Sequence, residues 1–196
     1  MSDRETIRVY DQRASEYADV TSSKSPDKTL KSFMNALPKG GKVLDLGCGP
    51  GLAAGYMAAQ GFDVEAWDAS AEMVALASKQ PEVKTRQAVF ADLAAVDVYD
   101  GIWANFSLLH APRDQMPEHL AAIQCALKPK GLFHIALKEG DGHKRDSLGR
   151  QYNYYTVETL SALLQDAGLT PGPYRTGVDM GLDGMPAAWI STTAYA

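Results

Sequence analysis

The sequence has few cysteines and no dense pattern of metal ligands. Its two cysteines, Cys48 and Cys125, lie in a glycine-rich segment and in a predicted helix, without the spacing of a zinc or iron site. Small secreted domains that depend on disulfides have many more cysteines for their length. We therefore expect two reduced thiols, no bound metal and no disulfide framework.

The chain also lacks a long apolar run and an excess of positive charge. No segment approaches the about 18 apolar residues of a membrane span. The opening segment, MSDRETIRVYDQ, is charged from its third residue and has no apolar core of a signal peptide. The formal net charge is -5, and the lysines and arginines are scattered along the chain. We therefore expect a cytoplasmic protein without nucleic-acid or membrane partners.

The order of apolar segments predicts one α/β domain over residues 1–196. In residues 1–38, apolar side chains recur at helical spacing on either side of TSSKSPDKT, which predicts two helices that cover the core. From residue 39 onward, short apolar runs alternate with helical patterns, as is typical of a doubly wound parallel sheet with helices on both faces. Near the end, PYRTGV and AAWISTTAYA have no helix between them and predict an antiparallel hairpin at the sheet edge.

The segment VLDLGCGPG, residues 43–51, indicates a ligand site at the end of the first predicted strand. Gly47, Gly49 and Gly51 predict a turn whose free backbone N–H groups, together with a helix dipole, point at one polar or anionic group. The third glycine comes one residue too early for the nicotinamide fingerprint Gly-x-Gly-x-x-Gly, and no Gly-Lys-Ser/Thr of a P-loop follows. A tight turn that binds no ligand is the alternative.

Asp45 narrows the choice of ligand. This carboxylate lies two residues before the first glycine. Beside a bound ligand it would repel a pyrophosphate and attract an ammonium or sulfonium group. We therefore expect a zwitterion with positive charge near Asp45 and a carboxylate near the glycine amides, a description that S-adenosylmethionine fits.

Two more acidic residues lie at positions suited to an adenosine. Asp68 ends the second predicted strand, 17 residues after Gly51, where it can accept hydrogen bonds from ribose hydroxyls; its alternative role is to cap the next helix. Asp92 follows the third strand and is predicted to bind the adenine amino group, with a backbone contact from Leu93, or else to be a solvated loop residue. Met73 is predicted to cover one face of the adenine.

These motifs resemble those of the class I S-adenosylmethionine-dependent methyltransferases, specifically small single-domain bacterial members similar to tellurite-resistance and ubiquinone-biosynthesis methyltransferases. VLDLGCGPG resembles their first motif, WDAS their ribose-binding acid, ADL their adenine contact, and YDGIWANFSLLH and ALKPKGLFHI their fourth and fifth strands. The resemblance implies a seven-stranded sheet with a reversed last strand, S-adenosylmethionine as cofactor and S-adenosylhomocysteine as product. It adds four residues to the expected cofactor site: Tyr17 on the covering helix, Cys48, Ala69 and Asn105.

His110 is the candidate catalytic residue. It follows the fourth strand in NFSLLH, beside the expected position of the methyl group, and a histidine there can act as a general base near neutral pH. The alternative is a histidine that only lines the pocket. Methyl transfer depends mainly on alignment and on exclusion of water, so a base is required only for an acceptor that starts protonated.

The methyl acceptor is predicted to be a small molecule held under the N-terminal helices and the segment 138–155. This segment is basic and rich in tyrosine within an acidic chain, and long loops at the ligand end of a sheet are often functional. A solvated surface loop is the alternative. The candidate acceptor residues, suited to an anionic or aromatic molecule, are Arg145, Arg150, Tyr152, Tyr154 and Tyr155.

Two other classes of function stay open. Asp45 and the glycine spacing argue against a nicotinamide-dependent oxidoreductase. A cofactor-binding sensor or partner module that has lost catalysis would carry the same motifs. The sequence identifies neither the acceptor nor the methylated atom, and it is compatible with a monomer or a homodimer.

Overall fold

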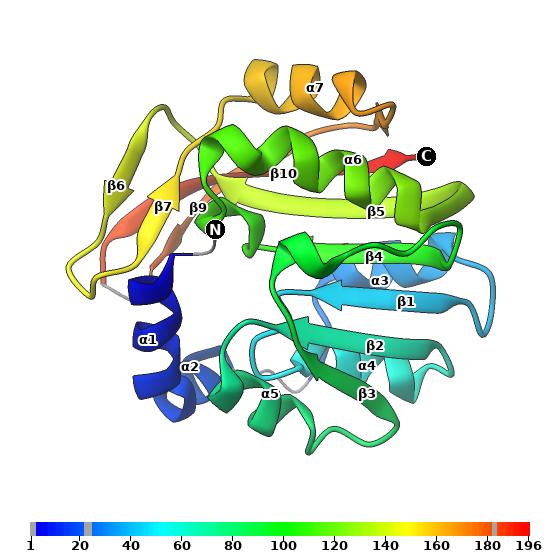
Figure 1. Ribbon diagram of the computed structural model, residues 1–196, viewed down its shortest axis with the longest axis horizontal. Helices are drawn as coiled ribbons and strands as arrows, with labels where there is room; N and C mark the ends of the chain where they lie inside the picture. Colours follow the sequence, from blue (N-terminus) through cyan, green and yellow to red (C-terminus); the bar gives the residue numbers. More distant parts are fainter. Residues whose placement is uncertain (1–2, 22–24, 182–183) are drawn as a thin grey trace.

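The computed structural model describes residues 3–21, 25–181 and 184–196, and its centre is a twisted sheet with helices on both faces (Figure 1). The strands lie in the order β3-β2-β1-β4-β5, all parallel, so the chain changes its direction of winding between β1 and β4. Ligands of open α/β sheets bind at such a switch point, outside the carboxyl ends of the strands. The five strands are β1 (Lys42–Leu46), β2 (Asp63–Asp68), β3 (Val83–Gln87), β4 (Tyr99–Asn105) and β5 (Leu127–Lys138).

The sheet ends in antiparallel strands. β10 (Pro186–Tyr195) runs antiparallel to β5, and its other edge pairs with β8 (Thr170–Pro171) and β9 (Arg175–Met180). The predicted doubly wound class, the reversed last strand and the closing hairpin are therefore confirmed. Among the described residues the sheet has eight strands, because the two-residue β8 is added to the predicted seven.

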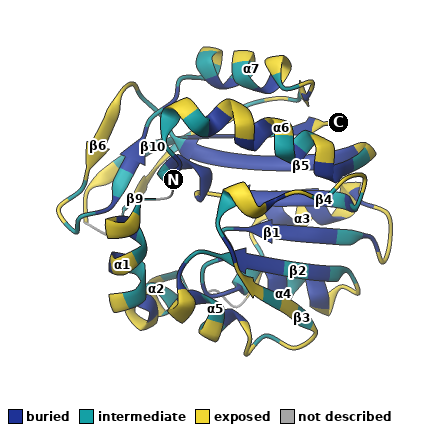
Figure 2. Cartoon of the chain, in the orientation of Figure 1, coloured by how far each residue is buried: buried dark blue, intermediate teal, exposed yellow. Residues whose placement is uncertain are grey.

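Residues of each central strand alternate between two apolar cores. Leu44 and Leu46 of β1 belong to the core that contains the buried faces of α6 and α7, whereas Val43 belongs to the core shared with α3 and α4. Burial of the central strands is visible in Figure 2. Their apolar runs are nearly continuous because both faces are covered.

The helices are short, and none in the described part of the chain has the length and apolar character of a membrane span. Their starts follow capping rules: Ser70 accepts a hydrogen bond from the amide of Met73, and Thr156 from that of Thr159. The helices are α1 (Arg4–Gln12), α2 (Ala14–Thr21), α3 (Lys28–Ala36), α4 (Leu52–Ala59), α5 (Ala71–Ala77), α6 (Met116–Ala126) and α7 (Val157–Asp166).

The N-terminal cover contains three helices where two were predicted. The first predicted helix is divided into α1 and α2 at Arg13, whose backbone leaves helical geometry. Nothing in the local sequence explains this division. Figure 1 shows α1 beside the carboxyl ends of the strands, where it also contacts α5.

The segment 138–155, predicted as a loop, contains a β-hairpin. Its strands β6 (His143–Arg145) and β7 (Gln151–Asn153) pair with each other in a separate two-stranded sheet. The hairpin lies beside α1 (Figure 1). The side chains predicted to hold the acceptor therefore belong to a folded element with its own partners.

Candidate active site

A cavity of about 310 Å³ lies at the carboxyl ends of β1, β2 and β4, under the N-terminal helices. Its size is at the lower end of the range for small-molecule sites. Most of the residues predicted for the cofactor line it, and His110 does so too. These lining residues are Tyr17, Asp45, Gly47, Cys48, Gly49, Asp68, Ala69, Met73, Asn105 and His110.

Gly47 allows the ends of β1 and β4 to approach each other. Its φ is 78°, and a Cβ atom at this position would lie 2.3 Å from the Cβ of Ser107. The Ser107 hydroxyl donates a hydrogen bond of 2.6 Å to the carbonyl of Leu46, which fixes the two strand ends together. Only glycine combines this left-handed backbone with this close approach.

The backbone amides of the glycine loop are already bonded within the protein. The amides of Gly47 and Cys48 donate to the carbonyl of Trp67 at 2.8 and 2.9 Å, and that of Gly51 donates to the carbonyl of Cys48 at 3.0 Å. The Gly49 amide donates to the Asp68 carboxylate at 2.9 Å. The prediction that these loop amides are free to bind an anionic group is therefore wrong, because the amides of Gly47, Cys48 and Gly49 bond to the end of β2 and that of Gly51 bonds within the turn.

Gly51 serves helix packing. It precedes α4 with a φ of 79°, and an added Cβ would lie 2.8 Å from the Cβ of Ala77 on α5. Gly51 is not among the lining residues of the cavity. Its position in the motif thus brings α4 and α5 close together, and any contact with the cofactor stays a prediction.

Asp45 is a buried carboxylate that faces the cavity. Its side chain is 2% exposed and accepts one hydrogen bond, 3.2 Å long, from the amide of Ala54. Within the described residues it forms no ion pair. Burial raises the pKa of Asp45 to about 7, and the nearby Asp68 adds to the effect. Such a carboxylate favours a ligand that brings a positive charge.

Asp68 joins the end of β2 to the glycine loop. Its two carboxylate oxygens accept hydrogen bonds of 2.9 Å from the amides of Gly49 and Ser70. The helix cap that was an alternative role for Asp68 is supplied by the Ser70 hydroxyl. Burial raises the pKa of Asp68. Each oxygen retains acceptor capacity, so two ribose hydroxyls fit this carboxylate.

Asp92 and Leu93 are not brought to the cavity. The Asp92 side chain is exposed and accepts a hydrogen bond of 2.9 Å from the amide of Val89, and the Leu93 side chain is buried in the core. Val89 and Phe90 line the cavity instead. The short turn Phe90–Asp92 after β3 was not expected from the sequence, and it directs the Asp92 side chain to the surface. The predicted adenine contact of Asp92 stays untested.

His110 is held in one tautomer. Its Nδ1 lies 2.6 Å from the carbonyl of Gln151, and because a carbonyl can only accept, Nδ1 must carry the proton. The unprotonated Nε2 accepts a hydrogen bond of 2.9 Å from the Tyr10 hydroxyl. Burial lowers the pKa of His110 to about 4, so the imidazole is neutral near pH 7. Tyr10 lines the cavity beside it and meets the ring of Tyr17 edge-on, 5.5 Å between centroids.

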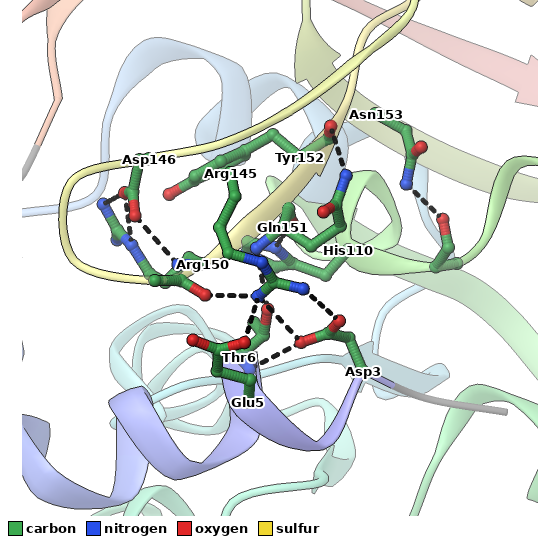
Figure 3. A network of polar contacts seen from close by, with 12 residues as sticks. Asp3, Glu5, Thr6, His110, Arg145, Asp146, Arg150, Gln151, Tyr152 and Asn153 are labelled. Atoms are coloured by element: carbon green, nitrogen blue, oxygen red, sulfur yellow. Dashed lines mark hydrogen bonds and ion pairs between the residues drawn. The ribbon is translucent and has the colours of Figure 1, made fainter.

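The hairpin fastens α1 over the site (Figure 3). Arg145 forms an ion pair of 2.7 Å with Asp3 and one of 3.3 Å with Glu5. The amide of Gln151 donates to the hydroxyl of Thr6 at 2.8 Å. The hydrogen bond from Arg145 lowers the pKa of Asp3 to about 2. These contacts form a clasp between the start of α1 and the hairpin.

The five residues predicted to hold the acceptor do not line the cavity. Arg145 belongs to the clasp, and Arg150 is buried in an ion pair of 2.7 Å with Asp146. Tyr152 and Tyr155 are buried in the core, and Tyr154 packs against it. The structure thus gives these side chains roles in packing and in fixing α1, and their contact with an acceptor stays a prediction.

Several lining residues were missed or undervalued. Tyr10 and Trp103 lie on apolar stripes that predict only packing, and Tyr56 lies in a helix next to the glycine loop. Phe106 and Ser107 directly follow Asn105 at the end of β4. The one available signal was position, since residues just beyond a parallel strand face the ligand crevice.

The clasp can be tested by Arg145→Gln. We expect dissociation of a cofactor-sized ligand to become about threefold to tenfold faster, because a half-exposed ion pair contributes on the order of 1 kcal/mol. Stopped-flow measurement at low ionic strength and again at about 0.5 M salt checks this, since screening should shrink the difference. Arg13→Gln is the matched control, because its ion pair with Glu16 lies outside the clasp. Equal rates for the two variants would contradict the role of the clasp.

Residues 15–171 match the family model for a methyltransferase domain. The chain is 32% identical over 135 residues to YqeM of Bacillus subtilis, which is 64% of this chain and 53% of YqeM. It is 30% identical over 120 residues to malonyl-acyl-carrier-protein O-methyltransferase of Enterobacter lignolyticus, which is 58% of this chain and 46% of that protein. The chain thus spans about half the length of these curated relatives. It belongs to the methyltransferase domain family, which confirms the resemblance.

A similar solved structure is that of 1,6-didemethyltoxoflavin-N1-methyltransferase from Burkholderia thailandensis, with bound 1,6-didemethyltoxoflavin and S-adenosylhomocysteine. It is 27% identical, has a TM-score of 0.72, and the match covers 96% of this chain and 87% of that chain. These comparisons favour neither the nicotinamide-dependent oxidoreductase nor the sensor module.

Proposed function

We propose that this protein transfers the methyl group of S-adenosylmethionine to a small molecule bound in the same cavity. The observation that carries the proposal is the buried Asp45 carboxylate beside the glycine loop, raised in pKa and without a cationic partner among the described residues. It supports a ligand whose positive charge lies beside the glycine loop, where a dinucleotide would place its negatively charged pyrophosphate. The bound S-adenosylhomocysteine in the similar structure from Burkholderia thailandensis adds support.

The residues of the cavity suit the parts of this cofactor. Asp68 accepts hydrogen bonds from the ribose hydroxyls, and Met73 and Phe90 provide apolar contacts for the adenine. Asp45 faces the positively charged methionine portion. The methionine carboxylate cannot rely on the loop amides of Gly47 and Cys48, because the carbonyl of Trp67 accepts from both.

When bound, the cofactor supplies an electrophilic methyl group. The protein aligns the acceptor with it and excludes water, which are the main contributions that a displacement at carbon requires. The N-terminal helices carry out the exclusion: Tyr10 and Tyr17 line the cavity, and the clasp holds α1 in place.

We further propose that His110 accepts a proton when the acceptor carries one on its nucleophilic atom. The Gln151 carbonyl holds the Nδ1–H, which leaves the Nε2 lone pair directed toward Tyr10 and the cavity. To act, His110 exchanges its hydrogen bond with Tyr10 for one with the acceptor. Its low pKa suits acceptors whose proton becomes acidic once the new bond to carbon forms.

His110→Ala should lower kcat about 100-fold and change the dissociation constant of S-adenosylmethionine less than about threefold. Tyr10→Phe is the matched control: it removes the hydrogen bond to Nε2 but keeps the ring, so kcat should change less than about tenfold. Since His110 is neutral above about pH 4, its protonation should produce no break in the rate between pH 6 and 8. Methylation rates and calorimetric titrations measure these quantities. Full activity of His110→Ala would show that His110 only lines the pocket.

A further inference from the structure

Phe106 has an unusual backbone where the cavity meets the end of β4. It is the first residue after β4, and its φ is 55°, in the left-handed region that bulky side chains rarely adopt. Its amide donates to the carbonyl of Ala136 at 3.0 Å, which holds the residue in this conformation. Strained residues of this kind gather at functional sites.

The Phe106 ring is partly exposed and pairs with no other aromatic ring among the described residues. The side chain is 37% exposed and lines the cavity. Other aromatic residues of the site do pair: Trp103 stacks on His134 with 3.7 Å between centroids, and Tyr10 meets Tyr17 edge-on. No ring of the described residues contacts Phe106 in this way. An exposed phenyl ring in a ligand cavity is suited to stack on a flat ligand.

The charges around the cavity are of one sign. Asp27, Asp45 and Asp68 line it together with Asp3, whose charge Arg145 offsets, and no lysine or arginine lines it among the described residues. The nearby arginines are occupied, since Arg145 pairs with Asp3 and Glu5 and Arg150 pairs with Asp146. Such a surface repels anions and tolerates neutral or cationic molecules.

We infer that the acceptor is an aromatic compound without negative charge, and that it stacks on the Phe106 ring. This inference rests on the proposed function and narrows its substrate class. Stacking on an electron-rich ring face suits neutral and cationic rings alike. The anionic acceptor that the sequence suggested for the segment 138–155 is not part of it, because the arginines of that segment have internal partners.

The substrate class is tested by a screen with S-adenosylmethionine labelled in its methyl group. Four sets of compounds are offered to the protein: neutral aromatic, cationic aromatic, anionic aromatic, and aliphatic amines and alcohols. We expect label in the first two sets only. Label in the anionic or aliphatic set would overturn the inference while supporting methyl transfer. Label in no set, with S-adenosylhomocysteine binding intact, would overturn the proposed function and the inference with it.

Lys24 falls outside the described residues and lies close in sequence to Ser25, which lines the cavity. The screen is therefore repeated with Lys24→Gln. Labelling of neutral and cationic rings should be unchanged. A preference for anionic rings that Lys24→Gln removes would assign an anion site to this lysine and contradict the inference.

The role of Phe106 is tested on the acceptor with the highest labelling. Phe106→Leu, which keeps bulk but removes the ring, should raise its KM about tenfold or more, whereas Phe106→Tyr should stay within about threefold of the wild type. Phe106→Gly separates loss of the ring from misfolding, because glycine adopts this backbone freely. This variant should have the same or a higher melting temperature than the wild type and should still bind the acceptor more weakly. The dissociation constant of S-adenosylhomocysteine should change little in all three. An unchanged KM in Phe106→Leu and Phe106→Gly would overturn the assignment.

Discussion

Asp45→Asn is expected to lower the affinity for S-adenosylmethionine at least about 100-fold and at the same time to stabilise the free protein. The affinity falls because the variant no longer offers a negative charge to the cation in a buried site, where hydrogen bonds and charges count most. The stability rises because a buried carboxylate without a cationic partner is costly to ionise. Asparagine keeps the shape and can accept the hydrogen bond from the Ala54 amide.

The sign of the stability effect follows from the pKa of Asp45. The pKa of Asp45 is about 7 in the folded protein, against the ordinary aspartate pKa of 3.8 in an unfolded chain. Between these values the folded protein binds more protons, so the free energy of unfolding falls as pH rises from about 4 to 7. At about pH 8 the charged form destabilises the fold, and Asp45→Asn should recover on the order of 2 kcal/mol.

Urea denaturation and calorimetric titration at several pH values measure both effects. Wild-type affinity for S-adenosylmethionine should fall about tenfold per pH unit below the pKa of Asp45, and this dependence should be absent in the variant. Asp63→Asn on the same sheet is the control, because Asp63 is only partly buried, lies outside the cavity and loses only a surface ion pair with Lys84, so it should affect neither quantity much. An Asp45→Asn protein that binds normally would remove Asp45 from the cofactor site.

Gly47→Ala is expected to destabilise the fold by about 3 kcal/mol or more and to abolish cofactor binding. The new Cβ would lie 2.3 Å from the Cβ of Ser107, and the φ of 78° disfavours any side chain. The ends of β1 and β4 must separate, which breaks the hydrogen bond from the Ser107 hydroxyl to the Leu46 carbonyl. Both the melting temperature and the binding isotherm report this change.

Gly61→Ala separates backbone strain from the steric clash. Gly61 has a φ of 86°, yet an added Cβ meets nothing within 4 Å. This variant should lose about 1 to 2 kcal/mol from the left-handed backbone alone and should bind the cofactor normally. If both variants lost the same stability, the contact with Ser107 would have no part in the effect.

The sheet order and the reversed last strand could be predicted because alternating strands and helices permit few topologies. The hairpin within 138–155 could not, since its strands are short and the partners of its Arg145 are Asp3 and Glu5, more than a hundred positions away. The division at Arg13 has no local signal. The hairpin therefore depends on contacts between residues far apart in the sequence, which a local sequence pattern does not reveal.

Some features of the site could likewise be predicted from the local sequence, and others could not. Asp45 and Asp68 were identified because an acid at the end of a strand faces the crevice wherever the sheet is parallel. The bonds made by the loop amides were not foreseen, because they depend on how closely β1 approaches β2. The fixed tautomer of His110 depends on the Gln151 carbonyl of the hairpin, which sequence reasoning could not place.

The most direct test is a parallel calorimetric titration with S-adenosylmethionine, S-adenosylhomocysteine and NAD at about pH 8, where Asp45 is charged. We predict micromolar binding of both adenosyl ligands and none of NAD. Binding of NAD, or no binding of either adenosyl ligand at this pH, would contradict the assignment of the cavity to S-adenosylmethionine.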